Sequence, residues 1–283
     1  MATFINDSPV ITSLQNPQIK QLVKLRNRRE RDIAKLYMIE GYRELLRALQ
    51  QKTKLETIYF CPELFLGTSE NSLLDSAIQR GIKLIQLSTA AFSKVSYRDR
   101  PDGLLGVGEQ QFRTLEEAES LLTHAKNPML LIVETLEKPG NLGSIIRSAD
   151  GAGVDAIFVC DPATDIHNPN VIRSSVGTCF SIPLFVTTSF DAHALLEKYK
   201  VPIYATSPDT STLYCELDYR GPTAFAMGRE QVGLSKFWFE KATQVIAIPM
   251  LGIADSLNVS NATTILLYET LRQRSCLLYT SPS

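Results

Sequence analysis

The stretch Val133–Gly153, with the sequence VETLEKPGNLGSIIRSADGAG, joins an apolar run to a helical pattern through a turn that contains Pro139 and Gly140. The apolar run begins at Met129 and reads MLLIVE, which is typical of a short strand buried on both faces of a parallel sheet. The spacing after the turn predicts a helix over residues 142–151. This order of strand, glycine turn and helix predicts an α/β fold and raises the question of which ligand the turn holds.

Neither common nucleotide-binding template fits this turn. A dinucleotide-binding turn needs G-x-G-x-x-G directly after the strand, whereas the spacing here is Gly140-x-x-Gly143. A phosphate-binding loop needs Lys followed by Ser or Thr after its last glycine, and no such pair follows Gly143. Taken alone, the turn is better interpreted as a tight connection that uses glycine for backbone reasons.

Two further strand-like runs end in the same way. They lie in Thr223–Ser235 (TAFAMGREQVGLS) and in Val245–Thr263 (VIAIPMLGIADSLNVSNAT). Each of the three turns combines glycine with polar side chains, which are Asn141 and Arg147, Arg229 and Glu230, and Ser256 and Asn258. Because ligands of open α/β sheets bind beyond the carboxyl ends of the strands, three such turns can converge on one ligand.

Apolar segments alternate with helical patterns along both halves of the chain. In the second half, the pattern predicts strands at 129–135, 155–160, 183–186, 202–206, 223–227 and 244–248, and helices at 142–151, 190–199, 234–240 and 258–273. In the first half, it predicts strands at 37–41, 56–60, 82–87 and 104–109, and helices at 18–29, 42–50, 72–80 and 88–95. We therefore expect a small three-layer domain, then a mostly parallel sheet covered on both faces.

Composition restricts the class of protein. The 283 residues are enough for two ordinary domains, and 44% hydrophobic with 21% charged residues is usual for a globular chain. No apolar run reaches the roughly 20 residues that span a bilayer, and residues 1–10 lack the pattern of a secretory signal. The five cysteines form no CxxC pair and the three histidines complete no metal pattern, so we expect reduced thiols, no metal, no membrane and a cytoplasmic location.

The formal net charge of −1 conceals an asymmetry between the two halves. Residues 1–113 contain 17 Lys and Arg against 12 Asp and Glu, whereas residues 114–283 contain 12 against 18. A basic first half suggests that this half binds a polyanion. The predicted helix at 18–29 and its end hold the densest group of cations: Lys20, Lys24, Arg26, Arg28, Arg29 and Arg31. The alternative interpretation is a helix with an ordinary solvated face.

The three turns resemble the signature motifs of a known family. PGNLGSIIRSADGAG, AMGREQVGLS and IPMLGIADSLNVSNATTILLYE are similar, in order and spacing, to the three motifs of the SpoU, or TrmH-like, branch of the SPOUT RNA methyltransferases. The first half, from ITSLQNPQIKQLVKLRNRRERD through LYMIEGYRELLRAL, resembles the L30e-like RNA-binding domain of that family. The resemblance covers roughly residues 11–274.

The resemblance implies a domain plan and a fold. It implies an L30e-like substrate-binding domain over 1–113, a linker over 114–128 and a SPOUT methyltransferase domain over 129–274, whose parallel α/β sheet contains a deep trefoil knot. The remaining residues, 275–283 (SCLLYTSPS), do not continue the preceding pattern, and we interpret them as a non-native or disordered tail.

The resemblance also implies a reaction. The cofactor would be S-adenosylmethionine, the chain would act as a homodimer, and the methyl group would pass to a ribose 2′-hydroxyl of RNA. The similar family members act mostly on large-subunit rRNA, so 23S rRNA is the expected substrate and tRNA the alternative.

Five residues match the catalytic positions of the family: Asn141, Arg147, Glu230, Ser256 and Asn258. Arg147 would fix the RNA phosphate beside the target ribose and favour the developing alkoxide, because an arginine is a poor base. Glu230 would orient Arg147 or an asparagine across the site. Structural interpretations remain open for each: a surface arginine for Arg147, helix caps for the asparagines and Ser256, and a helix-dipole contact for Glu230.

Cofactor contacts are expected mainly from the backbone. The matching positions are Thr206, Ser207, Met227, Gly228, Ile248, Met250 and Leu257. Added bulk at Gly228 is expected to block the cofactor site. Arg173, in NPNVIRSSVGTCF (residues 168–180), matches a family helix near the RNA, although Gly177 there also fits a plain helix cap.

Two other classes of function remain as alternatives. A non-catalytic RNA-binding protein would keep the fold and lose turnover. The presence of all four of the residues Asn141, Arg147, Glu230 and Asn258 disfavours it. A nucleotide-dependent oxidoreductase is disfavoured by the missing G-x-G-x-x-G and by the basic first half.

Overall fold

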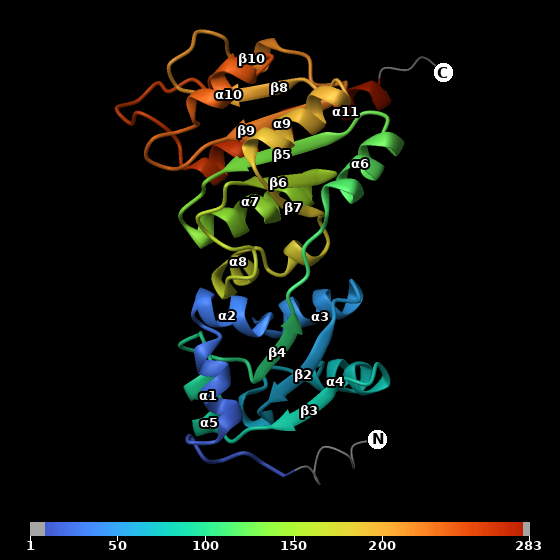
Figure 1. Cartoon of the computed structure of the whole chain (residues 1–283), viewed down its shortest axis with the longest axis vertical. Coiled ribbons are helices and arrows are strands. Elements are labelled where there is room, and N and C mark those ends of the chain that lie inside the picture. Colours follow the sequence, from blue (N-terminus) through green and yellow to red (C-terminus); the bar gives the residue numbers. More distant parts are fainter. Residues whose placement is uncertain (1–8, 280–283) are drawn as a thin grey trace. The chain divides into compact units, whose positions relative to one another are not determined.

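The computed structural model describes residues 9–279 of the chain (Figure 1). These residues form two compact units, each with its own sheet. Unit 1 contains the first half of the chain through Gln111 together with Asp165–Ser181, and unit 2 contains Phe112–Thr164 and the remainder from Ile182.

Unit 1 is built on a four-stranded mixed sheet. Its strands are β1 (Leu36–Glu40), β2 (Leu55–Phe60), β3 (Lys83–Gln86) and β4 (Leu104–Glu109), in the spatial order β1-β4-β2-β3. Only β2 and β3 pair in parallel. Helices α3 (Tyr42–Gln50) and α4 (Glu70–Gln79) pack on one face, and α1 (Pro17–Lys24) and α5 (Thr89–Val95) on the other. The prediction of a three-layer domain is confirmed.

The prediction of one continuous basic helix over residues 18–29 is wrong. The structure has α1 and then α2 (Arg28–Ala34), separated by a turn. The side chain of Asn16 accepts from the backbone N–H of Gln18 at 2.8 Å and starts α1. The Asn27 side chain accepts from the N–H of Arg29 and starts α2, so a second N-cap asparagine ends the predicted helix early.

Unit 2 is built on a six-stranded, wholly parallel sheet. Its strands are β5 (Met129–Glu134), β6 (Ala156–Cys160), β7 (Leu184–Thr187), β8 (Ile203–Thr206), β9 (Thr223–Met227) and β10 (Gln244–Ile246), in the order β10-β8-β9-β5-β6-β7. The predicted parallel sheet is confirmed. The trefoil knot stays a prediction.

Helices cover both faces of this sheet. Leu122, Leu196 and Trp238 place α6 (Leu115–His124), α9 (Ser189–Lys198) and α10 (Lys236–Lys241) on one face, with Leu130 and Phe158 beneath them. Helices α7 (Pro139–Ala152) and α11 (Val259–Tyr279) pack against each other on the opposite face (Figure 1). The order of the strands reverses at β5, since β6 and β7 extend to one side and β9, β8 and β10 to the other. Such a reversal is where ligands of parallel sheets bind.

The segment Asp165–Ser181 belongs to unit 1 although it lies between strands of unit 2 in sequence. It contains α8 (Pro169–Ser174) and the short 3-10 helix η2 (Thr178–Phe180). Ile172 joins the core formed by α3 and α4, and Asp165 forms an ion pair with Arg31 at 2.6 Å. The domain ranges predicted from the sequence are contiguous, so they do not assign this segment to the first domain.

Two further short 3-10 helices are η1 (Pro62–Leu64) and η3 (Tyr214–Glu216). Helix α11 continues through Tyr279, into the range 275–283 that we interpreted as a tail, and residues 280–283 lie outside the described residues. Within the described residues, no helix combines the length and apolar character that a bilayer-spanning segment needs.

Candidate functional site

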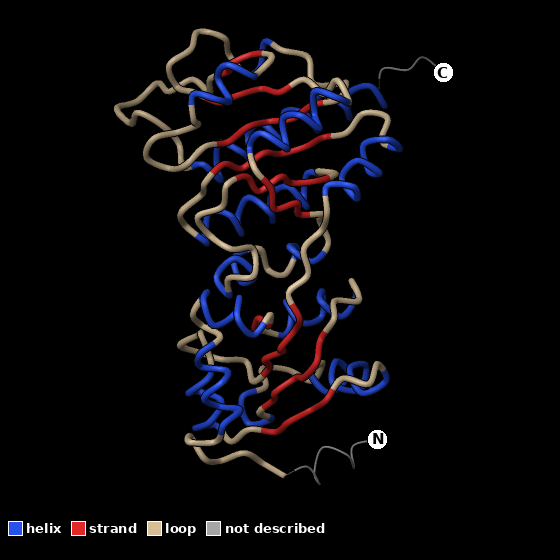
Figure 2. Tube along the Cα trace, viewed as in Figure 1, coloured by secondary structure: helices blue, strands red, loops and turns tan. Residues whose placement is uncertain are grey.

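The loops after β8, β9 and β10 gather at one end of the parallel sheet (Figure 2). The turn after β5 reaches the same end. It starts α7 with Lys138 as N-cap and Pro139 at the first helical position, which suits the fixed φ of proline. Asn141 therefore lies inside the first turn of α7, and its interpretation as an N-cap is wrong.

The amide of Asn141 connects all three motifs. Its Nδ2 donates to Oε1 of Glu230 at 2.7 Å, and its Oδ1 accepts from Nδ2 of Asn258 at 3.2 Å. Donor and acceptor ends are both engaged, so the orientation of the Asn141 amide is fixed. This chain of three side chains joins segments that lie 89 and 117 residues apart in sequence.

Glu230 also closes the N-terminal end of α7. Its carboxylate accepts from the backbone N–H groups of Glu137 at 3.4 Å and Lys138 at 3.3 Å, where the helix dipole favours negative charge. Burial opposes ionisation of this carboxyl, but the hydrogen bonds from Asn141 and the backbone outweigh it and lower the pKa of Glu230. Glu230 is thus held as an anion that only accepts hydrogen bonds. The structure shows the contact of Glu230 with the N-terminal end of α7 and gives it an asparagine as partner across the site, whereas its part in the reaction stays a prediction.

Asn258 has two contacts with different partners. Its Oδ1 accepts from the N–H of Ser260 at 2.9 Å and from the Ser260 hydroxyl at 2.6 Å, at the start of α11. Its Nδ2 donates to Asn141. The helix-cap interpretation therefore describes one end of this side chain, and the catalytic role predicted for Asn258 stays a prediction.

The loop between β9 and α10 closes on itself at Gly228. The backbones of Arg229 and Gly233 exchange hydrogen bonds of 3.1 and 3.0 Å. A Cβ on Gly228 would lie 2.2 Å from the backbone of Gly233 and Leu234. We expected bulk at Gly228 to block the cofactor site, but it would first force this loop open.

A buried carboxylate forms hydrogen bonds with the C-terminal end of the same loop. Glu134, the last residue of β5, accepts from the N–H of Ser235 at 2.7 Å and from its hydroxyl at 2.6 Å. The Ser189 hydroxyl lies 3.3 Å from the same carboxylate. Sequence reasoning missed Glu134. A Glu that ends an otherwise apolar buried strand was the available signal.

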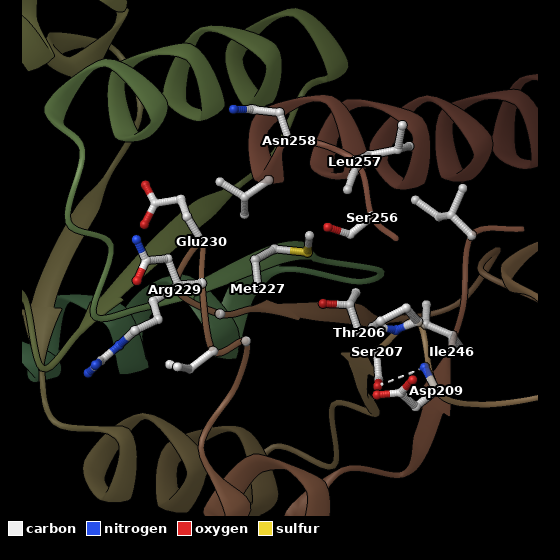
Figure 3. Close-up of a pocket in the computed structure, with 18 of the residues that line it drawn as sticks. Thr206, Ser207, Asp209, Met227, Arg229, Glu230, Ile246, Ser256, Leu257 and Asn258 are labelled. Atoms are coloured by element: carbon white, nitrogen blue, oxygen red, sulfur yellow. Dashed lines mark hydrogen bonds between the residues drawn. The ribbon is translucent and has the colours of Figure 1, made fainter. Parts of the chain in front are cut away.

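A cavity of about 590 Å³ opens beside this loop (Figure 3). All seven positions predicted to bind the cofactor line it, as do Glu230, Ser256 and Asn258 from the predicted catalytic set. They come from the ends of β8, β9 and β10 and from the start of α11 (Figure 3). The structure therefore brings the end of β8 together with the motifs that contain Glu230 and Asn258 around one space, whereas Asn141 lies outside the lining.

The cavity has an apolar lining with a polar side. Met227, Ile246 and Leu257 contribute apolar surface, while Thr206 and Ser207 contribute hydroxyls (Figure 3). These hydroxyls are already partly engaged: Thr206 donates to the Ala226 carbonyl at 3.0 Å, and Ser207 accepts from the N–H of Asp209 at 3.1 Å. A volume of this size, apolar with a few fixed polar groups, is typical of a site for a small molecule or cofactor. The carboxylates of Asp209 and Glu230 in the lining suit a ligand with a positive charge, as S-adenosylmethionine has.

Arg147 does not line the cavity. It lies exposed on α7, six residues beyond Asn141, where α7 is joined to α11 by a 2.7 Å hydrogen bond between Ser148 and Thr264. The predicted contact of Glu230 with Arg147 is therefore not made, and Asn141 takes its place. Arg173 is exposed on α8 in unit 1.

The six cations of the basic segment, which were predicted to bind RNA as Arg173 was, differ in exposure. Four of them are exposed: Lys20, Lys24, Arg28 and Arg29. Arg26 is half-buried and donates to backbone carbonyls. Arg31 is 1% exposed, donates to the carbonyls of Leu25 and Arg26 at 2.9 Å, and pairs with Asp165. The prediction that Arg31 contacts RNA is wrong, because its guanidinium is buried and hydrogen-bonded inside unit 1.

Known proteins resemble this chain in both halves. A model of the SpoU rRNA Methylase family matches residues 128–268, and a model of the MRM3-like substrate binding domain matches residues 16–106. The 23S rRNA (guanosine(2553)-2'-O)-methyltransferase RlmP of Bacillus subtilis (strain 168) is 29% identical over 258 residues, which are 91% of this chain and 97% of that protein.

Solved structures extend the likeness to the fold. An RNA 2'-O ribose methyltransferase is 39% identical with a TM-score of 0.82, over 94% of this chain and 100% of that one. An AdoMet-bound rRNA methyltransferase from Sinorhizobium meliloti is 28% identical with a TM-score of 0.80, over 94% and 98% of the two chains. The chain belongs to the SpoU rRNA methylase family, with a substrate-binding domain before the methylase domain. The predicted family is confirmed.

Proposed function

We propose that this chain is an S-adenosylmethionine-dependent RNA methyltransferase that modifies a ribose 2′-hydroxyl, with 23S rRNA as the substrate. The observation that carries the proposal is the hydrogen-bonded chain Glu230–Asn141–Asn258 at the edge of the cavity. The names of the relatives support it, since RlmP of Bacillus subtilis is named for ribose methylation of 23S rRNA and the Sinorhizobium structure is named as AdoMet-bound.

The cavity residues would hold the cofactor. When bound, S-adenosylmethionine supplies a methyl group on a sulfonium, so that electrophile and leaving group both come from the cofactor. The protein has then to align the ribose oxygen with that methyl group and to exclude water. Apolar Met227, Ile248 and Leu257 would exclude water, and the closed backbone loop at Gly228 would contact the cofactor through main-chain groups.

The three polar side chains would act on the ribose side. Glu230 is fixed as an acceptor, and it fixes the amide of Asn141, which in turn fixes Asn258. Such preorganised dipoles stabilise charge in a transition state because they need no reorientation during the reaction. Ser256 lies in the same lining and is proposed to contact the reacting groups.

Arg147 is proposed to act on the RNA and not on the cofactor. An arginine is a poor base, so Arg147 would bind a phosphate and favour the developing alkoxide rather than remove the proton. Its exposed place on α7, outside the cavity lining, suits contact with a macromolecule. The homodimer implied by the resemblance and the cytoplasmic location expected from the composition are part of the same proposal.

Methyl transfer from labelled S-adenosylmethionine tests the proposal. The substrates are unmodified 23S rRNA, 16S rRNA and tRNA, each digested to nucleosides after reaction. A labelled 2′-O-methylnucleoside from 23S rRNA is expected, and the same product from tRNA would reassign the substrate. Label on a base would contradict ribose methylation, and NADH binding as tight as cofactor binding would favour the oxidoreductase alternative.

Arg147→Ala separates the enzyme from a non-catalytic RNA-binding protein. Loss of one group that stabilises developing charge costs about 100- to 1000-fold in turnover. We expect that loss in methyl transfer, with cofactor affinity within about twofold because Arg147 is outside the cavity. Equal losses in methyl transfer and RNA affinity would contradict the catalytic role. Lys126→Gln, an exposed cation elsewhere in unit 2, is the control.

A further inference from the structure

Arg26 is held in place by the end of a neighbouring helix in unit 1. Its Nη2 donates to the carbonyl of Lys94 at 2.9 Å and also to the carbonyl of Ser96. These carbonyls belong to the C-terminal end of α5, which ends at Val95, and the dipole there favours a positive charge. The guanidinium is therefore immobilised close to the surface.

An aromatic ring lies beside this fixed cation. The Cζ atom of Arg26 is 5.8 Å from the centroid of the Tyr97 ring, within the range of a cation–π contact. The Tyr97 side chain is 36% exposed, so part of the ring faces solvent. Tyr97 is not among the residues that the sequence motifs single out.

The backbone that carries Tyr97 is anchored on both sides of the ring. Glu40, which is buried, accepts from the Ser96 hydroxyl at 2.5 Å and from the N–H of Tyr97 at 2.6 Å. Arg98 donates from Nη2 to the carbonyl of Glu40 and to Glu44, each at 2.8 Å. Three consecutive residues are thus tied to the turn between β1 and α3. An anchored aromatic loses little conformational entropy when it binds a ligand.

The sequence around the ring is basic. Lys94 and Arg100 are exposed on either side of Tyr97, Lys24 is exposed two residues before Arg26, and Asp99 is the one exposed acid between 94 and 100. Aromatic rings and arginine planes among such cations are how proteins bind unpaired nucleotides, since bases stack on the rings while cations contact phosphates.

We propose that Tyr97, with Arg26 fixed beside its ring, is a stacking platform for an unpaired base of the RNA. The platform rests on the proposed RNA substrate but assigns a new contact within it. It recognises single-stranded or looped RNA, because a base inside a duplex has no free face to stack.

Three variants test the platform by binding of a short single-stranded RNA of mixed sequence and of the same strand annealed to its complement. Tyr97→Ala is expected to weaken single-strand binding about 5- to 100-fold, the usual effect of removing one stacked base contact. Tyr97→Phe keeps the ring and should bind as the wild type does. Phe190→Ala removes an exposed aromatic of unit 2 and should change nothing.

A fluorescent variant tests stacking directly. Tyr97→Trp introduces an indole at the surface, whereas the native Trp238 is fully buried and shielded from nucleic acid. Emission of the new indole should be quenched by the single strand and unchanged by the duplex. Equal quenching by both, or wild-type affinity in Tyr97→Ala, would overturn the platform.

The result separates the platform from the proposed function. If Tyr97→Ala binds single-stranded RNA normally while the wild-type chain methylates RNA, the platform is wrong and the enzyme assignment stands. If the wild-type chain neither binds RNA nor transfers a methyl group, both are wrong. A melting temperature equal to that of the wild type shows that the variant is folded.

Discussion

The cavity of unit 2 and the basic segment of unit 1 were both predicted from runs of suggestive residues, and they differ in how the fold treats them. In unit 2, segments more than 80 residues apart converge, because each ends a strand of one parallel sheet. In unit 1, cations within 12 residues of one another separate, since Arg31 turns inward and Lys20 stays exposed.

The difference lies in what fixes the side chains. The carboxyl ends of parallel strands share one edge, so a turn after a strand has a determined position before any side-chain contact forms. A charged residue near a helix end has no such constraint. Whether it faces solvent depends on carbonyls and carboxylates contributed by distant segments, as Asp165 does for Arg31.

The largest expected effect is a loss of folding stability when the buried cation is replaced, which replacement of an exposed cation should not cause. Arg31→Met removes one partner of a buried ion pair and leaves Asp165 uncompensated, which costs about 3–5 kcal/mol of folding free energy. Urea unfolding followed by circular dichroism should show that loss. Arg29→Met, at an exposed position, should stay within about 0.5 kcal/mol of the wild type. A similar stability for the two variants would remove the distinction between the cations.

The next effect concerns the closed loop of the cavity. Gly228→Ala places a methyl group 2.2 Å from the Gly233 backbone, and forcing such a contact apart costs about 1–3 kcal/mol. Cofactor affinity should fall by up to about 100-fold, measured by calorimetry with S-adenosylmethionine.

Gly221→Ala is the matched control for this loop. A Cβ there meets no atom within 4 Å, so binding should be unchanged. An unaltered affinity in Gly228→Ala would mean that the loop 228–234 does not shape the cofactor site.

Much of the fold follows from the sequence because its signals are local. The apolar runs MLLIVE and TAFAM predict β5 and β9 closely, and the parallel sheet follows from helices between the strands. The split of the basic helix was not predicted, although Asn27 is a capping residue of the same kind as Asn16. The position of Asp165–Ser181 in unit 1 depends on contacts such as that of Ile172, which no local pattern encodes.

The sequence predicted which residues belong to the candidate site, but not which hydrogen bonds join their side chains. The positions matched to the family include seven cofactor positions, all of which line the cavity, as do Glu230, Ser256 and Asn258. Sequence alone did not select Asn141 over Arg147 as the partner of Glu230, because that choice depends on which side of α7 faces the cavity. Glu134, which fixes Ser235, was missed because one acid at the end of an apolar strand has no motif.

A double-mutant cycle tests the bond that the structure selected. A hydrogen bond to a charged group contributes about 1.5–3 kcal/mol, so Asn141→Ala should lower turnover about 10- to 100-fold. Glu230→Ala should lower it similarly, and the double variant should lose little more than either single variant, since both remove the same contact. Methyl-transfer rates at saturating cofactor provide the measurement. Losses that multiply would show that the two side chains act independently.

The smallest effect belongs to the cations that remained exposed. Lys24→Gln should reduce the slope of log RNA affinity against log salt concentration by about 1 if Lys24 contacts one phosphate, with little change in stability. Lys126→Gln, exposed in unit 2, should leave the slope unchanged. If both substitutions have the same effect, the positive charge acts as a diffuse field. An effect of Lys24→Gln alone would instead mean that the basic segment binds RNA at defined phosphates, even though Arg31 of the same segment is buried and does not take part.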